Sequence, residues 1–369
     1  MNILIITDNF YPEHNAIASR LYERAIYWAE WGHSVKVITS APNFPDGKVY
    51  SGYKNKWYQK EKIKNIDIIR IKTFISPNEG FFLRVLDFLS FIFPAFFVGI
   101  IEKKPDIIFT TSPQFFAACT AWMVKKIKNV PLVLEVGDIW PASIVGVGAM
   151  RNSFMIKFLE KLELFLYRSS DAVIVLSPDF KKNLNSRGIE EKKIFIIVNG
   201  VELNQFHPKN KNHYLMEKFH LLQKKFIVGY IGTHGMAHGL ENLLESVYLL
   251  KANPDIHFIL VGSGSERQKL IKKANELKLL NITFIPSQAK DKIADYWSLC
   301  DLALVHLKNQ AVFSEVLPSK IFEAMAMALP ILLVSPEGVA SNLVLAHNIG
   351  VWIPPENPHR LAESIKLLC

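Results

Sequence analysis

The sequence has few of the residues that build cross-links or metal centres. Its 369 residues include only three cysteines, unpaired in their spacing, so neither a disulfide framework nor a zinc site is credible. A reducing cytoplasm fits this cysteine usage best. No Asp-x-Asp motif occurs, and no cluster of histidine, aspartate and glutamate has metal-ligand spacing, so we expect no bound metal. The cysteines are Cys119, Cys300 and Cys369.

Long hydrophobic runs are also missing. The longest uncharged apolar stretch, residues 88–101, contains Pro94 and is shorter than the roughly 20 residues that span a bilayer, so we expect no integral membrane protein. The N-terminus has no basic region and reaches Asp8 before a signal-peptide core could form. Residues 88–101 suit a core helix or a membrane-facing helix equally, because the wider segment 80–104 begins and ends near basic residues. These are Arg84, Lys103 and Lys104.

Apolar and basic residues are abundant. With 50% hydrophobic and 21% charged residues, the chain is too apolar to be disordered and too long for one ordinary core, so we expect two domains. Lysine and arginine total 43 against 34 acidic residues, a formal charge of +9. This charge suits nucleic acid, an anionic membrane or phosphate-rich substrates, and composition alone does not choose among them.

Short apolar runs alternate with longer amphipathic segments along the chain. The runs are continuously hydrophobic, which is typical of parallel strands covered on both faces, so a βαβ pattern is predicted. A clear helix covers residues 20–31, with Leu21 and Ala25 on its apolar face and Gly32 closing its end. Strands in the first half are predicted at residues 2–7, 34–39, 66–72, 106–110, 131–135, 172–176 and 194–198.

A polar and basic stretch interrupts this pattern after the Asn199-Gly200 turn, and we place a domain boundary there. A second α/β series follows. We therefore predict two doubly wound Rossmann-like α/β domains, residues 1–200 and 201–369, with a ligand cleft at the carboxyl ends of their strands. The second series has predicted strands at 226–232, 256–261, 282–285, 302–306 and 330–334, and helices from Gly239, Ser265, Lys290, Ser319 and Pro358.

The run EVLPSKIFE, from Glu315 to Glu323, is the most informative motif. Two glutamates with seven residues between them, the second inside a helix that starts near Ser319, can both point toward the strand ends where ligands bind. Ser319 can cap this helix, the free amides of its first turn attract phosphate, and Lys320 adds a positive charge. An ordinary capped amphipathic helix with exposed acidic residues is the competing interpretation.

This run resembles the E-x7-E motif of the glycogen-synthase-like family of retaining glycosyltransferases, which have the GT-B fold of two Rossmann-like domains facing across a cleft. The resemblance implies that Glu323 holds the nucleotide ribose and that Glu315 lies beside the donor sugar and diphosphate. Other segments resemble the same family, in the same order, over nearly the whole chain. They are DNFYPEHNAIASR, GHSVKVIT and GDIWPAS in the first half, and VNGVELNQFHP, GTHGMAHGLENLLES, HFILVGSGSER and ADYWSLCDLALVHL in the second.

Two glycines mark a predicted phosphate cradle. Gly232 and Gly235 follow a strand and precede a helix, so the backbone can approach a diphosphate whose charge the helix dipole favours. His238 and Gly239 stand where many members of the resembled family carry Lys-Gly. Lys320 is therefore expected to take over the missing charge, and His238 is either a weak ligand contact or a solvated residue.

A further glycine pair, in GSGSE at residues 262–266, superficially suggests a dinucleotide site. It lacks the third glycine of G-x-G-x-x-G and a clear acidic residue after the following strand, so Gly262 is expected in a turn near the nucleotide. In the resembled family the base lies against the loop after the next strand. This implies a base held by backbone groups near Ser287, in the loop 285–288.

The first domain offers residues for the opposite side of the cleft. Asn15 and Ala16 stand where many relatives have a glycine pair, and close amide contact with the diphosphate is expected there. Asp138 follows a predicted strand and can orient the acceptor hydroxyl near the reacting sugar or cap the following turn. Many relatives have His-Asp in this region, so Gly137 leaves the role of that histidine vacant or filled by His14.

The resemblance implies retaining transfer from a nucleoside-diphosphate sugar by front-face attack, with Glu315, Lys320 and Asp138 as catalytic residues, no cofactor and no obligatory metal. The EHNAIASR and DIWPAS segments indicate bacterial surface-polysaccharide assembly, of O-antigen or capsule, on a polyprenyl-diphosphate-linked saccharide. Within that group the sequence is most similar to proteins assigned as L-fucosamine transferases. We expect an anionic membrane surface as a partner, peripheral attachment at the inner face of the cytoplasmic membrane, and no nucleic acid.

Other functions stay open on this evidence. A nucleotide-sugar 2-epimerase shares the architecture, but it needs a carboxylate and histidine set for proton abstraction that is not evident. An NAD-linked oxidoreductase needs the complete fingerprint, which is lacking. A non-catalytic binding protein is compatible with the changes at Gly137 and His238.

The end of the chain also departs from the resembled family. Its members usually continue past a helix like residues 358–368 with further helices, and the last of these crosses back onto the first domain. We therefore expect a second domain without that final crossover helix.

Overall fold

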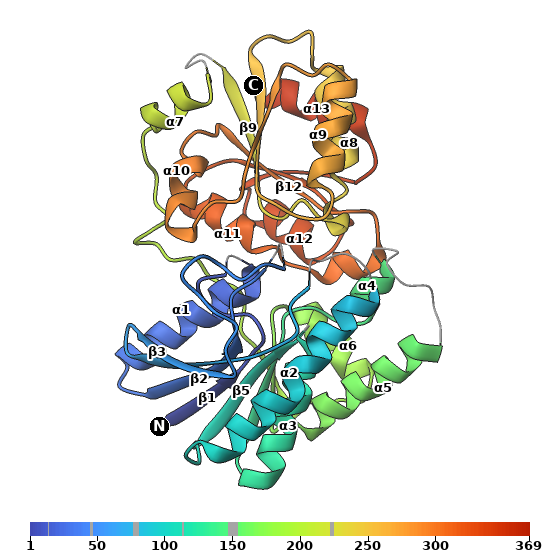
Figure 1. Ribbon diagram of the computed structural model, residues 1–369. Coiled ribbons are helices and arrows are strands. Elements are labelled where there is room, and N and C mark those ends of the chain that lie inside the picture. The colour runs from blue at the N-terminus through green and yellow to red at the C-terminus, as the bar shows by residue number, and fades with distance from the viewer. Residues whose placement is uncertain (14, 45–46, 77–80, 113, 147–153, 222–224) are drawn as a thin grey trace. The chain divides into compact units, whose positions relative to one another are not determined.

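The computed structural model describes the chain from Met1 to Cys369 except residues 14, 45–46, 77–80, 113, 147–153 and 222–224. The chain forms two compact units (Figure 1). The first comprises residues 1–142 and 150–198, and the second comprises residues 199–369 together with the segment 143–149. Each unit is built on its own sheet.

The first unit contains an eight-stranded sheet with strand order β3-β4-β2-β1-β5-β6-β7-β8. Its strands pair in parallel, except that β3 runs antiparallel to β4. The strands are β1 (Asn2–Ile6), β2 (Ser34–Ser40), β3 (Tyr58–Ile63), β4 (Ile66–Ile71), β5 (Ile107–Ser112), β6 (Leu132–Val136), β7 (Ala172–Val175) and β8 (Ile194–Ile196). The helices in this part of the chain are α1 (Ala16–Glu30), α2 (Phe81–Ile101), α3 (Phe115–Lys128), α4 (Ala142–Gly146), α5 (Phe154–Ser169), α6 (Pro178–Ser186) and the 3-10 helix η1 (Glu191–Lys193).

Helices cover both faces of this sheet. Successive residues of a strand point to opposite faces, so Leu4 of β1 packs in a buried cluster with residues of α2 and α3, whereas Ile5 packs with Leu21 of α1. Both faces of the central strands are therefore apolar, which explains the continuous hydrophobic runs in the sequence.

Helix α1 begins earlier than the periodicity predicts. The Asn15 side chain accepts a hydrogen bond from the Ala18 amide at 2.8 Å and caps the helix at Ala16. At the other end Gly32 has φ +85° and donates its amide to the Ala29 carbonyl at 3.1 Å. The predicted closing role of Gly32 is thus confirmed.

Strand β3 is absent from the sequence-based prediction. Its sequence, YQKEKI, is mostly polar and charged, and its residues alternate between exposed and half-buried, as suits an edge strand with a single neighbour. The turn into β4 places Lys64 and Asn65 at φ +44° and +64°. A charged edge strand of this kind lacks the continuous apolar run that predicts the inner strands.

A buried arginine holds the loops near the end of β4. The Arg70 guanidinium donates to the Glu61 carboxylate at 2.6 Å, to the Ser40 carbonyl at 3.0 Å and to the Tyr11 carbonyl at 2.6 Å. These partners lie on β3, on β2 and in the loop after β1. Arg70 therefore fixes the carboxyl edge of one half of the sheet.

The second unit contains a six-stranded sheet with order β11-β10-β9-β12-β13-β14, in which the strands pair in parallel. The strands are β9 (Phe226–Ile231), β10 (Ile256–Val261), β11 (Ile282–Ile285), β12 (Leu302–His306), β13 (Ile331–Val334) and β14 (Gly350–Ile353). The α-helices are α7 (His213–Lys218), α8 (Leu240–Leu249), α9 (Arg267–Glu276), α10 (Ile293–Trp297), α11 (Ser319–Ala326), α12 (Val339–Ala346) and α13 (Pro358–Leu368). Short 3-10 helices are η2 (Met236–His238), η3 (Lys290–Lys292) and η4 (Ala311–Glu315).

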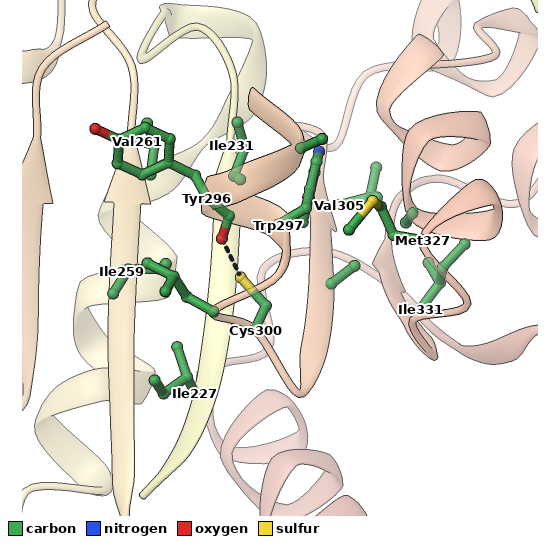
Figure 2. Close-up of a cluster of buried hydrophobic side chains, with 14 of the residues drawn as sticks. Ile227, Ile231, Ile259, Val261, Tyr296, Trp297, Cys300, Val305, Met327 and Ile331 are labelled. Carbon is green, nitrogen blue, oxygen red and sulfur yellow. Dashed lines mark hydrogen bonds between the residues drawn. The ribbon is translucent and has the colours of Figure 1, made fainter. Parts of the chain in front are cut away.

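One buried cluster of this unit packs α10 and α11 onto β9, β10, β12 and β13 (Figure 2). Trp297 and Cys300 lie at its centre, and the Cys300 thiol donates to the Tyr296 carbonyl at 3.4 Å. A Cβ on Gly229 of β9 would lie 2.2 Å from the Cys300 sulfur. Glycine at 229 thus lets the segment after α10 approach the strand closely.

The predicted fold class, α/β with two parallel-sheet Rossmann-like domains, is confirmed, and every predicted strand is present within two residues of its expected ends. Strand β14 and helix α12 were not predicted. Both are short, and β14 is partly exposed at the sheet edge. Among the helices that the structure describes, none has the length and hydropathy to span a bilayer.

Candidate functional site

The strand order of the second sheet creates a switch point between β9 and β12, because successive strands lie on opposite sides of β9. Ligands of doubly wound sheets bind where the order reverses, at the carboxyl ends of the strands. The segment after β9 carries Gly232, Gly235 and His238, and α11 carries Lys320 and Glu323. The structure therefore gathers these predicted residues in one unit.

Lys320 is the central residue of this site. It lies in the first turn of α11 and is 9% exposed, with its ammonium 4.0 Å above the centre of the Tyr230 ring. The Nζ atom has no hydrogen-bond partner among the described residues. Burial lowers the pKa of Lys320 from its usual 10.5 to about 7, against the opposing charge of Glu323. Lys320 is thus a buried amine whose charged form has no hydrogen-bonded anion among the described residues.

Glycines pack tightly around this cation. Gly232 and Gly262 have φ +148° and +153°, and a Cβ on Gly262 would lie 1.9 Å from the Gly232 carbonyl oxygen. A Cβ on Gly232 would lie 2.6 Å from the Lys320 Nζ. Gly264, at φ +148°, would clash with the His234 backbone in the same way. Gly235 differs, because its φ of −117° and a nearest neighbour at 3.4 Å would admit a side chain.

Three histidines surround the cradle, and all are neutral at pH 7. Burial lowers the pKa of His238 to about 3, and that of His234 and His306 to about 4, with the charge of Lys320 acting in the same direction. The His238 and His306 Nδ1 atoms donate to each other's carbonyl oxygens, at 3.2 Å and 2.6 Å. His238 therefore supplies no cation for a diphosphate, and Lys320 is left as the buried charge.

His234 was not identified from the sequence. It is 0% exposed, and neither ring nitrogen has a hydrogen-bond partner among the described residues. Its ring lies 5.8 Å from Tyr230 and 6.4 Å from Phe284, between centroids. Arg267, at the start of α9, adds a second positive charge near it and donates to the Gly262 carbonyl at 3.1 Å.

Glu323 is held in one orientation by two donors. Its Oε1 accepts from the Lys290 ammonium at 2.9 Å, and its Oε2 accepts from the Trp297 indole at 3.0 Å. The side chain is only 12% exposed. A carboxylate has about four lone-pair sites, so this arrangement leaves acceptor capacity for a pair of ligand hydroxyls. The sequence motif does not include Lys290 or Trp297, and only the structure shows that they hold the Glu323 carboxylate.

Two other predicted residues flank α11. Glu315 ends η4 and is half-buried. Ser319 was predicted to cap α11, and this is wrong, because Pro318 occupies the cap position without a side-chain hydrogen bond and Ser319 is the first helical residue. A Cβ on Gly338 would lie 2.1 Å from the Ser314 carbonyl, so the start of α12 presses against η4 just before Glu315.

Ser287 lies in the exposed loop after β11. Its neighbour Gln288 accepts a hydrogen bond from the Tyr296 hydroxyl at 2.9 Å, which ties this loop to α10. The Ser287 side chain is exposed and does not belong to the buried core. The position is compatible with backbone contact to a base.

The predicted residues of the first unit lie at the carboxyl edge of its own sheet. Asn15 caps α1 and Ala16 is the exposed first residue of that helix. Asp138 is half-buried just beyond β6, where its carbonyl accepts from the Trp140 amide at 3.1 Å. His14, the alternative to the missing histidine, lies outside the described residues.

The structure gives a physical reason for glycine at position 137. A Cβ there would lie 2.6 Å from Nη2 of Arg20 and 3.0 Å from the Ser112 carbonyl. Arg20 cannot move away cheaply, because its Nε donates at 2.6 Å to the buried Glu135 carboxylate, which Arg24 also contacts. A side chain at position 137 would therefore require Arg20 to shift away from its place beside Glu135.

Within the described part of the chain, no group of three or more His, Cys, Asp or Glu residues is arranged to hold a metal ion. Metal independence stays a prediction, and the buried charge of Lys320 is the observation on which it rests.

Comparisons with known proteins cover both units. Residues 17–205 match the family described as Glycosyltransferase Family 4, and residues 214–369 match the family described as Glycosyl transferases group 1. WcaI of Escherichia coli K12, a glycosyl transferase named for colanic acid biosynthesis, is 27% identical over 334 residues, or 89% of this chain and 81% of WcaI.

Solved structures show the same fold. HepE of Anabaena in complex with UDP-glucose has a TM-score of 0.73 at 17% identity, covering 100% of this chain and 89% of that one. WaaG, a glycosyltransferase involved in lipopolysaccharide biosynthesis, has a TM-score of 0.70 at 15% identity, covering 100% and 90%. The GT-B architecture expected from the resemblance is confirmed at the level of fold.

Proposed function

Because this chain belongs to the glycosyltransferases, with family 4 and group 1 matches over most of its length, we propose that it transfers a sugar from a nucleoside-diphosphate sugar to a lipid-linked saccharide. The observation that carries the proposal is the buried Lys320 ammonium, which has no hydrogen-bond partner among the described residues. A bound anion would remove the cost of that unpaired charge.

A diphosphate fits the cradle best. Glycine at 232 and 262 lets the two strand-end loops and the Lys320 ammonium approach one another closely, and the first turn of α11 places backbone amides beside Lys320. The HepE complex supports a nucleotide sugar, since a protein of the same fold binds UDP-glucose. We assign the diphosphate to Lys320, Gly232 and Gly262.

The two glutamates serve the sugar rings. Glu323 has acceptor capacity for the vicinal hydroxyls of a ribose, and Lys290 and Trp297 hold its carboxylate for them. Glu315 ends η4, a few residues before α11 begins, and it is assigned to the donor sugar. Neutral His238 is assigned to shape the cradle rather than to carry charge.

The chemistry follows from where charge develops. The bond between the sugar anomeric carbon and the diphosphate oxygen breaks, the acceptor oxygen bonds to that carbon from the same face, and the acceptor proton passes to the departing diphosphate. Charge on the leaving oxygen grows during this step, and Lys320 with the cradle amides stabilises it without a metal ion. Asp138 orients the acceptor hydroxyl.

The acceptor side is proposed from the outer faces of helices α2 and α5. Phe93 and Phe97 of α2 are 69% and 55% exposed, and Phe154 and Phe158 of α5 are also exposed. Helix α3 packs against both helices, as Figure 1 shows, and its last turn carries three lysines. Exposed aromatic side chains on the helices of a basic chain are typical of a surface that rests on an anionic bilayer.

We place this activity in bacterial surface-polysaccharide assembly, in O-antigen or capsule, at the inner face of the cytoplasmic membrane. The names of WcaI and WaaG, which refer to colanic acid and lipopolysaccharide, support that setting. N-acetyl-L-fucosamine remains the first donor to test.

The test is release of nucleoside diphosphate from a panel of UDP-, GDP- and dTDP-sugars, including UDP-N-acetyl-L-fucosamine, with and without bacterial membranes. We expect release from one donor, only when acceptor membranes are present, and without added divalent ions. Epimerised sugar formed without acceptor would indicate a 2-epimerase instead. Absence of turnover with every donor, despite nucleotide binding, would leave a binding protein and refute the transferase.

Lys290 and Trp297 should control ribose recognition through Glu323. We expect the intact protein to bind the 2′-deoxy and 3′-deoxy forms of its preferred nucleoside diphosphate about 10-fold or more weakly, because each lost bond to a charged acceptor costs about 1.5–3 kcal/mol. Trp297→Phe and Lys290→Met should shrink this ratio. Lys292→Met, an exposed lysine of the same 3-10 helix, should not change it. Unchanged ratios in the first two variants would show that Glu323 needs no positioning.

A further inference from the structure

A groove of about 660 Å³ opens in the first unit. Three stretches of chain form it: the connection from β2 to β3, the residues that follow β4, and the middle of α2. Its lining includes Val49, Trp57, Lys72, Thr73, Phe74 and Pro94.

The groove lies at the edge of the sheet where ligands of this architecture bind. Strand β4 ends at Ile71, directly before Lys72 and Thr73, and Tyr58 at the start of antiparallel β3 pairs with Ile71. Trp57 therefore reaches the same carboxyl edge from the neighbouring strand. Asp138 follows β6 at this edge too, so the groove and the proposed acceptor-orienting residue share one edge of the sheet.

Two polar side chains of the groove lining, Lys72 and Thr73, have no polar partner among the described residues. Thr73 is 5% exposed, and its hydroxyl has no hydrogen-bond partner among the described residues. Lys72 is exposed, and its ammonium lies 4.7 Å from the Trp57 ring and pairs with no described acidic side chain. The exposed ammonium is suited to the oxygens of a phosphate group, and the buried Thr73 hydroxyl would gain a partner by turning toward such a ligand.

The other polar side chains of the lining are already occupied. Asn55 exchanges hydrogen bonds with the Thr73 backbone, donating to its carbonyl at 2.7 Å and accepting from its amide at 3.2 Å. The Ser90 hydroxyl accepts from the Phe74 amide at 2.7 Å and donates to the Asp87 carbonyl at 2.6 Å. These bonds shape the groove wall and leave Lys72 and Thr73 to meet the ligand.

The rest of the groove is apolar and continues toward an apolar surface. Trp57 is 73% exposed and Phe74 is half-exposed, an arrangement that costs free energy while no ligand covers it. Pro94 of α2 forms one wall, and its neighbours Phe93 and Phe97 make up the exposed stripe of the same helix. A hydrocarbon chain that leaves the groove therefore meets apolar side chains rather than water.

We propose that this groove binds the lipid carrier of the acceptor, a polyprenyl phosphate or diphosphate. Lys72 and Thr73 bind its phosphate, and the first isoprene units lie against Trp57, Phe74 and Pro94. The rest of the chain passes along the exposed face of α2 into the bilayer. The assignment rests on the proposed transfer to a lipid-linked saccharide, and it identifies the residues that recognise the lipid.

The experiment is calorimetric titration of the full chain with farnesyl phosphate below its micelle concentration, with farnesol and inorganic phosphate as separate probes. We expect farnesyl phosphate to bind at least 10-fold more tightly than either probe. Lys72→Met and Thr73→Val should each weaken farnesyl phosphate about 3- to 10-fold and leave farnesol unchanged. Trp57→Ala should weaken both farnesyl compounds.

Lys56→Met is the matched control, an exposed lysine on the same connection that does not line the groove. Thr73→Val removes an unpartnered hydroxyl at nearly constant shape, so its thermal unfolding should match that of the unaltered protein. Equal farnesyl phosphate affinity in the unaltered protein, Lys72→Met and Thr73→Val would overturn the proposal, as would equal binding of farnesol and farnesyl phosphate.

Failure of the groove and failure of the proposed transfer are distinguishable. Lipid binding is measured without nucleotide, and nucleoside diphosphate affinity is measured on the same samples. If the groove variants keep both their nucleotide affinity and their affinity for farnesyl phosphate, the proposed lipid site is refuted and the proposed transfer is not. A protein that binds farnesyl phosphate as described but turns over no nucleotide sugar would refute the transferase and keep the groove.

Discussion

Lys320→Met is expected to weaken nucleoside diphosphate binding by about 100-fold or more, because removing one partner of a buried charge pair costs about 2–5 kcal/mol. The ammonium is enclosed beside Tyr230 and Gly232, so little solvent screens its charge. Calorimetry with the preferred nucleotide measures the change. Lys292→Met, which removes an exposed lysine of the same unit, should bind as the unaltered protein does.

The same residue should make binding depend on pH. The pKa of Lys320 is about 7 in the free protein, so a rising fraction of the molecules must take up a proton to bind an anion as pH increases above 7. Nucleotide affinity should fall across this range in the unaltered protein and stay nearly level in Lys320→Met. A level profile in both proteins would contradict the assignment of the diphosphate to Lys320.

Without nucleotide, the charge that serves binding should cost stability. Between pH 7 and 10.5 the unfolded chain carries a proton on Lys320 that the folded protein has lost, so the free energy of unfolding rises with pH in this window. Below pH 7 both states carry the proton and the full cost of burial remains. Lys320→Met should therefore unfold at higher denaturant than the unaltered protein at pH 6, with a smaller difference at pH 9.

Gly262→Ala is expected to destabilise the second unit by about 3 kcal/mol or more. The new Cβ would meet the Gly232 carbonyl oxygen at 1.9 Å, and φ +153° is a conformation that alanine rarely adopts. Both strands behind the cradle would have to shift. Denaturant unfolding gives the loss of stability, and nucleotide titration should show that binding is lost with it.

Gly235→Ala is the matched control for that substitution. Its φ of −117° suits any residue, and the nearest atom to a new Cβ, Cγ2 of Thr233, would lie at 3.4 Å. We expect stability to stay within about 1 kcal/mol of the original or to rise, because alanine restricts the unfolded chain. If the two alanine variants unfold at the same denaturant concentration, the close packing of Gly262 on Gly232 is wrong.

The parallel strands could be predicted from the sequence because burial on both faces leaves a continuous apolar record, as in FIVGYI of β9. The edge strand β3 leaves no such record, since half of its side chains face solvent. The capping role given to Ser319 failed for a local reason, the presence of Pro318 at the cap position. The preference of serine for helix N-caps does not show which of two neighbouring residues occupies the cap position.

The sequence predicts those site residues that lie together in one motif. Glu323 and Lys320 were recognised because they stand in one short run of sequence. Trp297 and Lys290 lie 26 and 33 residues away from Glu323 in the chain, so only folding shows that they hold its carboxylate. The neutral state of His238 likewise depends on enclosure and on the charge of Lys320, neither of which can be seen in the sequence.

The groove residues Lys72 and Thr73 show the same limit. Nothing in the residues after β4 distinguishes them as a ligand site, and Thr73 becomes notable only because its buried hydroxyl lacks a partner while Asn55 and Ser90 are occupied. A buried polar atom without a partner therefore marks a candidate site that the sequence alone does not show.

The close fit of Cys300 against Gly229 has a practical consequence. Burial raises the pKa of this thiol far above its usual range, so it reacts only after the chain around it has opened. The rate at which Cys300 is alkylated in the native protein therefore measures how often the packing between β9 and α10 opens. Slower alkylation in the presence of nucleotide would show that a bound nucleotide reduces the opening of the core around Cys300.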